Sequence, residues 1–273
     1  MRPTFNHPTF DQLKALKLDG MAEAFVELQS QDQAADLSHA EWLGLLLDRE
    51  LARRSTQRFK SRLKSAKLRH AQAAVEDVDY RIPRQLDKAL FQQLAAGRWI
   101  AEHRNLILTG QCGVGKSWLA CALAQKACRD GYTALYVRVP RLFADLALAH
   151  GDGSFMQLFR KLIRVDLLAL DDLGPDRFTS DQRRDLMEIV EDRHGKGSIL
   201  ITSQIGVAKW HDIIGEPTYA DAILDRIVHS AYRLELNGPS VRKLKATVQA
   251  EPEVLPADDS TAAQRDNKTS KPR

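Results

Sequence analysis

Cysteine is scarce in this chain: only three occur among 273 residues. Cys112, Cys121 and Cys128 show no CxxC spacing, and no histidine lies near enough in the sequence to complete a zinc site. Cys121 and Cys128 are seven residues apart, which would place them on one face of a helix as small core residues. The cysteines therefore argue against a zinc-binding protein.

Long apolar runs are missing as well. No stretch approaches the roughly 20 apolar residues that a helix needs to cross a bilayer, and the polar residues 1–7 lack the pattern of a secretory signal. We therefore expect a cytoplasmic protein with no membrane partner. Internal repeats are absent, and 273 residues are enough for one domain of ordinary size plus a smaller one.

Acidic residues are nearly absent between Arg49 and Arg69, although the whole chain has a net charge of only +4. Glu50 is the single acid in this stretch. Such a local excess of positive charge is typical of a protein that binds a polyanion. The basic residues expected to contact DNA are Arg53, Arg54, Arg58, Lys60, Arg62, Lys64, Lys67 and Arg69.

The basic stretch is predicted to be helical, with cations on broad adjoining faces; Arg58 and Arg62, for example, are four residues apart. Such a surface suits phosphates better than base edges, so we expect salt-sensitive binding to DNA with little sequence preference. The alternative is an ordinary solvated helix face. Like charges four residues apart destabilise a helix unless a partner compensates them, which favours the DNA-binding interpretation.

A phosphate-binding loop stands at residues 110–117, whose sequence GQCGVGKS matches the pattern GxxxxGK[ST]. It follows an apolar run predicted to be a strand and precedes a predicted helix. Glycines let backbone N–H groups turn toward phosphates, and the helix start adds the positive end of its dipole. Lys116 is expected to bind the β- and γ-phosphates, and Ser117 to bind Mg²⁺. The predicted ATP site comprises Gly110, Gln111, Cys112, Gly113, Val114, Gly115, Lys116, Ser117 and Trp118.

The order of predicted elements indicates two folded parts. Capping boxes at Thr9–Gln12 and Ser38–Glu41 start helices, so residues 1–75 are expected to form a small all-helical, DNA-binding domain. Residues 76–84 are acidic and non-periodic and are the predicted linker, while residues 246–273 are expected to be a disordered tail.

Between these segments, residues 85–245 alternate strands with helices, which predicts a three-layer α/β domain. Short apolar runs of this kind suit a parallel sheet that is covered on both faces. Predicted strands are residues 106–108, 134–137, 166–170, 199–202 and 232–236; predicted helices include residues 141–149, 155–163 and 179–193.

Two predicted strands deliver polar side chains at their carboxyl ends. Asp171 is expected to hold Mg²⁺, directly or through water, and Asp172 to orient or deprotonate the attacking water. The alternative for Asp172 is a simple turn cap. Ser203 or Gln204, at the end of the next strand, would hydrogen-bond the γ-phosphate or its water unless this segment is only a turn.

Further cations lie in the predicted α/β domain. Arg226 stands in an apolar helix, where it pairs with Asp221 or Asp225 or projects into a neighbouring subunit as an arginine finger. A second basic set would line a channel in an assembly; it comprises Arg138, Arg141, Arg160, Lys161 and Arg164.

Four stretches in this order resemble the AAA+ ATPases: the phosphate loop, LLALDD at 167–172, ILITSQ at 199–204 and DAILDRIVH at 221–229. More narrowly, residues 13–24, 58–68, 210–229 and 240–243 resemble the IstB family, the transposition helper ATPases of insertion sequences and relatives of the helicase loader DnaC. The resemblance covers nearly everything from about residue 10 to 245.

This resemblance implies an ASCE-type P-loop sheet with strand order 5-1-4-3-2, ATP-dependent homo-oligomerisation, non-sequence-specific binding of double-stranded DNA, and transfer of that DNA to a transposase. It places Ser203 and Gln204 at the sensor-1 position and Arg226 at the arginine finger. Arg242 would stand in for a sensor-2 arginine that binds ATP.

Two other functions fit parts of the sequence. In a DnaC-like helicase loader, the N-terminal domain would grip a replicative helicase and the ATPase would prefer single-stranded DNA. A metabolic P-loop kinase would need an acceptor pocket, and it leaves the basic helix and Arg226 unexplained.

Overall fold

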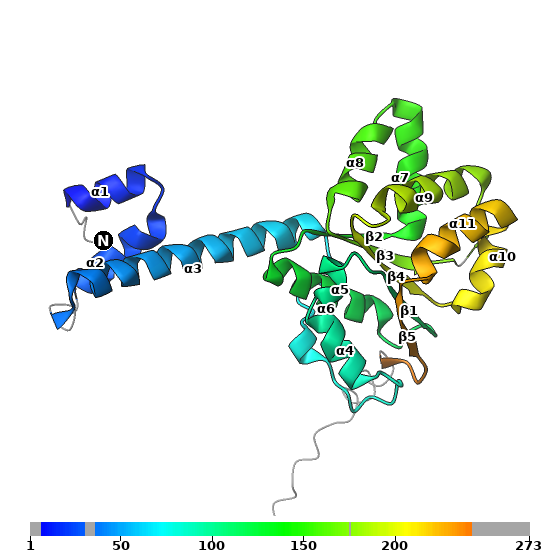
Figure 1. The fold of residues 1–273 in the computed structure, drawn as a ribbon, viewed down its shortest axis with the longest axis horizontal. Helices are drawn as coiled ribbons and strands as arrows, with labels where there is room; N and C mark the ends of the chain where they lie inside the picture. The colour runs from blue at the N-terminus through cyan, green and yellow to red at the C-terminus, as the bar shows by residue number, and fades with distance from the viewer. Residues whose placement is uncertain (1–6, 31–35, 175, 242–273) are drawn as a thin grey trace, which may run out of the picture.

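A computed structural model describes residues 7–30, 36–174 and 176–241. Five parallel strands form one sheet with the order β2-β3-β4-β1-β5 (Figure 1). Counted from the other edge this is 5-1-4-3-2, so the predicted fold class and strand order are confirmed. The strands are β1 (Leu106–Gly110), β2 (Ala134–Arg138), β3 (Leu167–Leu173), β4 (Ser198–Ser203) and β5 (Tyr232–Leu236).

Helices cover both faces of the sheet, which makes three layers (Figure 1). Side chains alternate between the faces: Leu106 and Leu108 pack on one core cluster and Ile107 on the other. The first face carries α4 (Lys88–Ala95), α5 (Arg98–Ala101) and α6 (Lys116–Asp130). The second carries α7 (Val139–Asp152), α8 (Phe155–Arg164), α9 (Ser180–Arg193), α10 (Trp210–Ile214) and α11 (Pro217–Val228).

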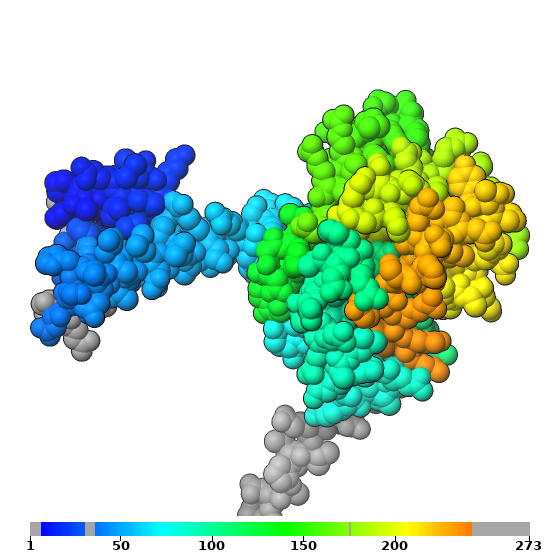
Figure 2. Space-filling view, in the orientation of Figure 1, coloured from blue at the N-terminus to red at the C-terminus, as the bar shows by residue number. Residues whose placement is uncertain are grey.

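Three helices precede this α/β body: α1 (Pro8–Ala15), α2 (Asp19–Gln29) and the 28-residue α3 (His39–Ala66). They enclose a small core of their own, built on Met21, Phe25 and Leu46. The start of α2 is held to α3 by backbone N–H groups that donate to the buried Glu50. Figure 2 shows these helices joined to the body through α3. No helix in the described ranges is long and apolar enough to cross a membrane.

The predicted helix starts are only partly correct. Ser38 with Glu41 and Thr179 with Gln182 both form complete capping boxes. The prediction for Thr9 is wrong, because α1 begins two residues earlier, with His7 rather than Thr9 as its N-cap. Pro8 occupies the first turn, where its fixed φ suits a helix and its missing N–H costs nothing, and the ring of His7 accepts from the Thr9 N–H.

The segment between α3 and α4 packs into the body. Ala66, Leu68, Ala73 and Val78 are buried in the same core cluster as α6, and a short 3-10 turn, η2 (Val75–Asp77), lies among them. The sequence divides this segment between a helical domain and a linker, whereas the structure makes it part of the α/β core. The sequence does not reveal this packing, because the buried apolar residues of the segment are few and are separated by polar ones.

Arg193, at the end of α9, joins the end of α8 to the start of β4 and is 1% exposed. It donates to the carbonyls of Leu162 (2.8 Å), Val165 (2.9 Å) and Ser198 (2.7 Å). Burial lowers its pKa to about 10, so the side chain stays charged at neutral pH.

We expect Arg193→Met to lower the free energy of unfolding by about 3–5 kcal/mol, because it leaves these buried carbonyls without donors. Urea denaturation measures the change. The control is Arg184→Met on the same helix, whose side chain is 68% exposed and which should change stability by less than about 0.5 kcal/mol. Equal effects of the two substitutions would contradict the prediction.

Candidate functional site

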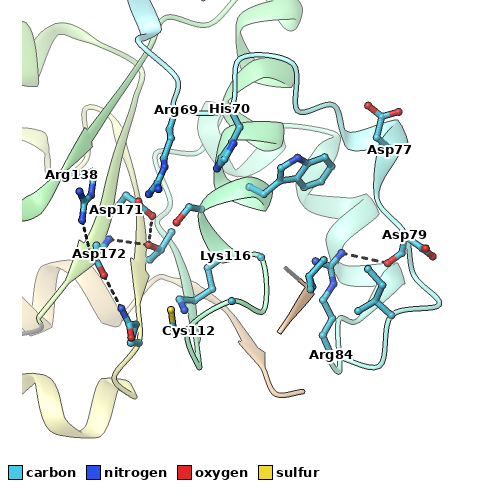
Figure 3. A pocket seen from close by; sticks show the side chains of 18 residues that line it. Arg69, His70, Asp77, Asp79, Arg84, Cys112, Lys116, Arg138, Asp171 and Asp172 are labelled. Atoms are coloured by element: carbon cyan, nitrogen blue, oxygen red, sulfur yellow. Dashed lines mark hydrogen bonds and ion pairs between the residues drawn. The ribbon is translucent and has the colours of Figure 1, made fainter. Parts of the chain in front are cut away.

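A cavity of about 530 Å³ opens at the carboxyl ends of β1, β3 and β4. This is where parallel α/β sheets bind ligands, since loops and helix starts converge there. Figure 3 shows the cavity from close by. Its walls come from the phosphate loop, the acidic pair, the end of β4, and the segment that follows α3. From the predicted ATP site it includes Cys112, Gly113, Gly115, Lys116, Ser117 and Trp118.

The phosphate loop depends on two glycines with positive φ. Gly115 has φ 97° and stands immediately before α6, and a Cβ there would lie 2.8 Å from the guanidinium of Arg84. Gly113 has φ 90°, and a Cβ there would lie 2.3 Å from the hydroxyl of Ser240. Both positions therefore need glycine for conformation, and Gly113 needs it for space as well. Val114, between them, is fully buried.

Lys116 is the first residue of α6 and is only 7% exposed. Its Nζ donates to the carbonyls of Gly110 (2.7 Å) and Gln111 (2.8 Å). Burial lowers the pKa of Lys116, and the nearby charges of Asp171 and Asp172 counteract this effect. The ammonium is therefore held inside the loop at the start of α6, and helix N-termini are common binding sites for phosphates.

Asp171 is 1% exposed, and each of its carboxylate oxygens is held by one hydroxyl. Thr202 donates to Oδ1 at 2.6 Å, and Tyr136 donates to Oδ2. Burial, followed by this hydrogen bond, raises the pKa of Tyr136, which keeps it a donor. The carboxylate is therefore fixed in orientation at the edge of the cavity.

Asp172 is adjacent and more exposed, and it lies where the β3–β4 register shifts. Its φ is 67°, a left-handed conformation that is uncommon outside glycine and often marks a functional position. Its backbone N–H donates to the Thr202 hydroxyl (3.0 Å). Its side chain accepts from Arg138 (3.0 Å) and Gln204 (3.1 Å). This ion pair raises the pKa of Arg138.

Thr202 links the two acids, whereas the sequence points to Ser203 and Gln204 at this strand end. The Ser203 side chain is fully buried, donates to the Leu173 carbonyl (2.7 Å) and does not line the cavity. Gln204 does line it. The alternation of side chains along a strand is the signal that was available, because it places Thr202 and Gln204 on one face and Ser203 on the other.

We expect Thr202→Val to slow ATP hydrolysis about 10- to 100-fold while ATP binding changes little, because valine keeps the shape but removes the hydroxyl that orients both acids. Single-turnover hydrolysis and calorimetry separate the two effects. The matched control, Ser203→Ala, should lower stability without slowing hydrolysis by folded protein. Normal hydrolysis in the Thr202 variant would contradict the role assigned to this hydroxyl.

The structure does not place either of the two arginines predicted to act at the ATP site, Arg226 and Arg242, in the cavity wall that it describes. Arg226 on α11 forms an ion pair with Glu191 of α9 at 2.6 Å, rather than with Asp221 or Asp225. It does not line the cavity, so within one subunit it does not reach the phosphate loop. Arg242 lies outside the described residues. The residue before it, Val241, donates its N–H to the Gly113 carbonyl (2.9 Å).

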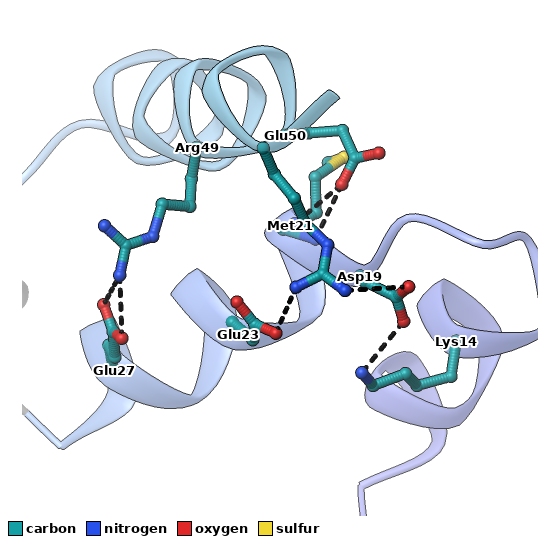
Figure 4. Close-up of polar contacts among 9 residues, drawn as sticks. Lys14, Asp19, Met21, Glu23, Glu27, Arg49 and Glu50 are labelled. Carbon is teal, nitrogen blue, oxygen red and sulfur yellow. Dashed lines mark hydrogen bonds and ion pairs between the residues drawn. The ribbon is translucent and has the colours of Figure 1, made fainter. Parts of the chain in front are cut away.

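Part of the basic stretch is neutralised within the protein (Figure 4). Arg53 pairs with Asp19 (3.2 Å) and with Glu23, and Arg54 pairs with Glu50 (2.6 Å). The compensation that the predicted helix needs therefore comes, for these residues, from acids of α2 and of α3 itself. Arg62 donates to the Cys128 carbonyl of α6 (2.9 Å). Among the predicted DNA contacts, Arg58, Lys60, Lys64, Lys67 and Arg69 are exposed and have no ion pair in the described chain.

The second basic set is also divided. Arg138 lies in the cavity beside Asp172, and Arg141 pairs with Asp145 one turn further along α7 (2.9 Å). The remaining three, Arg160, Lys161 and Arg164, are exposed on α8. Two members of this set therefore pair with carboxylates of the same chain, and a channel in an assembly stays a prediction.

The 5-1-4-3-2 parallel sheet, the phosphate loop at the end of β1, and the acidic pair at the end of β3 define an ATPase of the AAA+ class. Residues 11–250 match the family described as IstB-like ATP binding protein. The chain belongs to this family.

Relatives and solved structures agree with this assignment. An insertion sequence ATP-binding protein of Sinorhizobium fredii is 58% identical over 237 residues, which cover 87% of this chain and 96% of the relative. One of Mycobacterium tuberculosis is 34% identical, with 85% and 93% covered. The crystal structure of DnaI has a TM-score of 0.53 at 25% identity, covering 60% of this chain and 91% of DnaI. AMPPCP-bound DnaA from Aquifex aeolicus shares the fold, with a TM-score of 0.52 at 16% identity, covering 65% and 55%.

Proposed function

We propose that this protein is an ATP-dependent, largely non-sequence-specific duplex-DNA-binding ATPase that forms homo-oligomers on target DNA and assists the transposase of an insertion sequence. Its family membership and its insertion-sequence relatives support the transposition context. The observation that carries the DNA-binding part is the exposure of four cations, Arg58, Lys60, Lys64 and Lys67, along the half of α3 nearest the ATPase body.

We infer that Mg²⁺ accompanies the bound ATP. The Ser117 hydroxyl and the Asp171 carboxylate are hard oxygen donors, which this ion prefers, and both border the cavity. Within the described residues no group of three His, Cys, Asp or Glu is placed to hold a metal ion, so phosphate oxygens and water would complete its coordination. When bound, Mg²⁺ would neutralise developing charge on the phosphates.

Asp172 is the proposed catalytic carboxylate. It is more accessible than Asp171, and Gln204 and Arg138 restrict its orientation. A water between this carboxylate and the γ-phosphate would be oriented or deprotonated by it. Gln204, on the neighbouring strand, would contact the same water. Arg226 is proposed to act in a neighbouring subunit, which requires its ion pair with Glu191 to open on assembly.

Binding of a labelled random duplex, with and without ATP, across a salt series tests this function, with particle mass recorded alongside. Four phosphate contacts predict a slope of log affinity against log salt of about −4 per protomer. ATP should tighten binding and produce large particles by linkage. If ATP changes neither affinity nor particle size, the proposal fails. Preference for single strands over duplex would favour a helicase loader instead.

A matched pair of variants tests which cations bind DNA. Replacing both Lys60 and Lys64 with alanine should reduce the slope by about 2, because two phosphate contacts are lost. Arg49→Ala is the control, since this arginine lies on the same helix but pairs with Glu27 (3.0 Å) and should leave the slope unchanged. Equal slopes for all three proteins would place the DNA contact elsewhere.

A further inference from the structure

Arg69 is predicted from the sequence to contact DNA; in the structure it is an exposed residue that also lines the nucleotide cavity. It lies three residues after the end of α3, and it lines the cavity together with Lys116, Ser117 and Asp171. Figure 3 shows its side chain extending from the end of α3 toward Asp171. The two functions proposed for this protein therefore meet at the end of one helix.

The charges in the cavity leave Arg69 available for an anion. The charge of Arg138 is paired with Asp172. By contrast, no carboxylate lies within ion-pair distance of Arg69 in the described part of the chain. Burial raises the pKa of Tyr136 most and the hydrogen bond to Asp171 adds to this, while Arg69 counteracts both. Arg69 and Asp171 line the same cavity, so the guanidinium lies near the acidic edge of the site (Figure 3).

Helix α3 is also attached to the other end of the phosphate-loop helix. The Nε of Arg62 donates to the Cys128 carbonyl (2.9 Å), near the C-terminus of α6, whereas Arg69 reaches the cavity at its N-terminus. Between them, Ala66 is fully buried in the core. Lys67 ends α3 in a left-handed conformation, with φ 51°. The end of α3 therefore spans the length of α6.

We propose that Arg69 binds the phosphates of the nucleotide and thereby couples ATP to the DNA-binding surface of α3. A guanidinium forms strong, directional hydrogen bonds to phosphate oxygens. Such bonds would fix the chain two residues beyond Lys67, and with it the position of the exposed cations Arg58, Lys60 and Lys64. The coupling half of this proposal rests on the proposed DNA-binding function; the nucleotide half does not.

The test compares Arg69→Ala with Lys64→Ala, a control that removes an exposed cation of α3 outside the cavity. MgATP binding is measured by calorimetry without DNA, and duplex binding is measured with and without ATP. We expect Arg69→Ala to weaken ATP binding about 10-fold or more and to leave nucleotide-free duplex binding unchanged. Lys64→Ala should leave ATP binding unchanged and weaken duplex binding without nucleotide. Arg69→Lys, which keeps the charge, should recover part of the ATP affinity. Such a recovery would show that the weaker ATP binding of Arg69→Ala does not come from a loss of folding.

The coupling is measured as the ratio of duplex affinities with and without ATP, which by linkage equals the effect of duplex on ATP affinity. This ratio should fall toward 1 in Arg69→Ala and stay at its wild-type value in Lys64→Ala. Unchanged ATP affinity in Arg69→Ala would overturn the proposal. If duplex binding without nucleotide were weakened as well, the result would indicate that Arg69 contacts DNA instead. Weakened ATP binding with an unchanged ratio would overturn the coupling. A wild-type protein that does not bind duplex would refute the proposed function, while the ATP measurement would still decide whether Arg69 binds nucleotide.

Discussion

Replacing Lys116 with alanine is expected to abolish ATP binding and, with it, ATP-dependent assembly. The ammonium is buried at the start of α6 and is held by the Gly110 and Gln111 carbonyls, so it needs little rearrangement to meet phosphate oxygens. Alanine leaves the backbone cradle without its cation. A charged hydrogen bond to phosphate contributes about 1.5–3 kcal/mol, and this lysine can form more than one, so we expect a loss of at least about 100-fold in ATP affinity.

Calorimetric titration with MgATP measures this loss, and light scattering records assembly. The matched control is Lys126→Ala on the same helix, because this lysine pairs with Asp130 and does not line the cavity. It should bind ATP like the wild type. ATP binding by the Lys116 variant within a few-fold of normal would show that the loop does not hold phosphates as proposed.

Asp172→Asn is expected to keep ATP binding and DNA-bound assembly but to slow hydrolysis by about 10²–10³-fold. The substitution keeps the shape of the side chain and removes the negative charge that would accept a proton from, or orient, the attacking water. Asparagine also tolerates the left-handed conformation at this position, where φ is 67°. The effect on folding should therefore be small, and the loss should appear in the chemical step.

Single-turnover hydrolysis with saturating protein isolates that step. Asp145→Asn is the control: this exposed carboxylate of α7 pairs with Arg141 and lies outside the cavity, so its removal should not change the rate. Normal turnover in the Asp172 variant would remove this residue from the catalytic role and leave it as a partner of Arg138.

Much of the fold could be predicted because its signals are local. Residues 106–108 and 199–202 are short apolar runs, and both lie within strands of the observed sheet. The prediction of β3 ended at Leu170, whereas the strand continues through the acidic pair to Leu173. The register shift there, which accommodates Asp172, depends on the neighbouring strand and leaves no pattern in the local sequence.

The sequence by itself determined the parallel α/β body, the phosphate loop and the acidic pair, since each follows from residue types at short, defined spacings. Only the tertiary structure decided which cations of the basic stretch remain on the surface, because their partners are distant in the chain. Arg53 meets an acid 30 residues away, and Arg62 meets a carbonyl 66 residues away. Arg69 belongs to the same run of charge and is exposed, but after the turn that ends α3 it also lines the nucleotide cavity. Charge density predicts a polyanion partner, whereas the packing of α3 against α6 determines which anion each residue can reach.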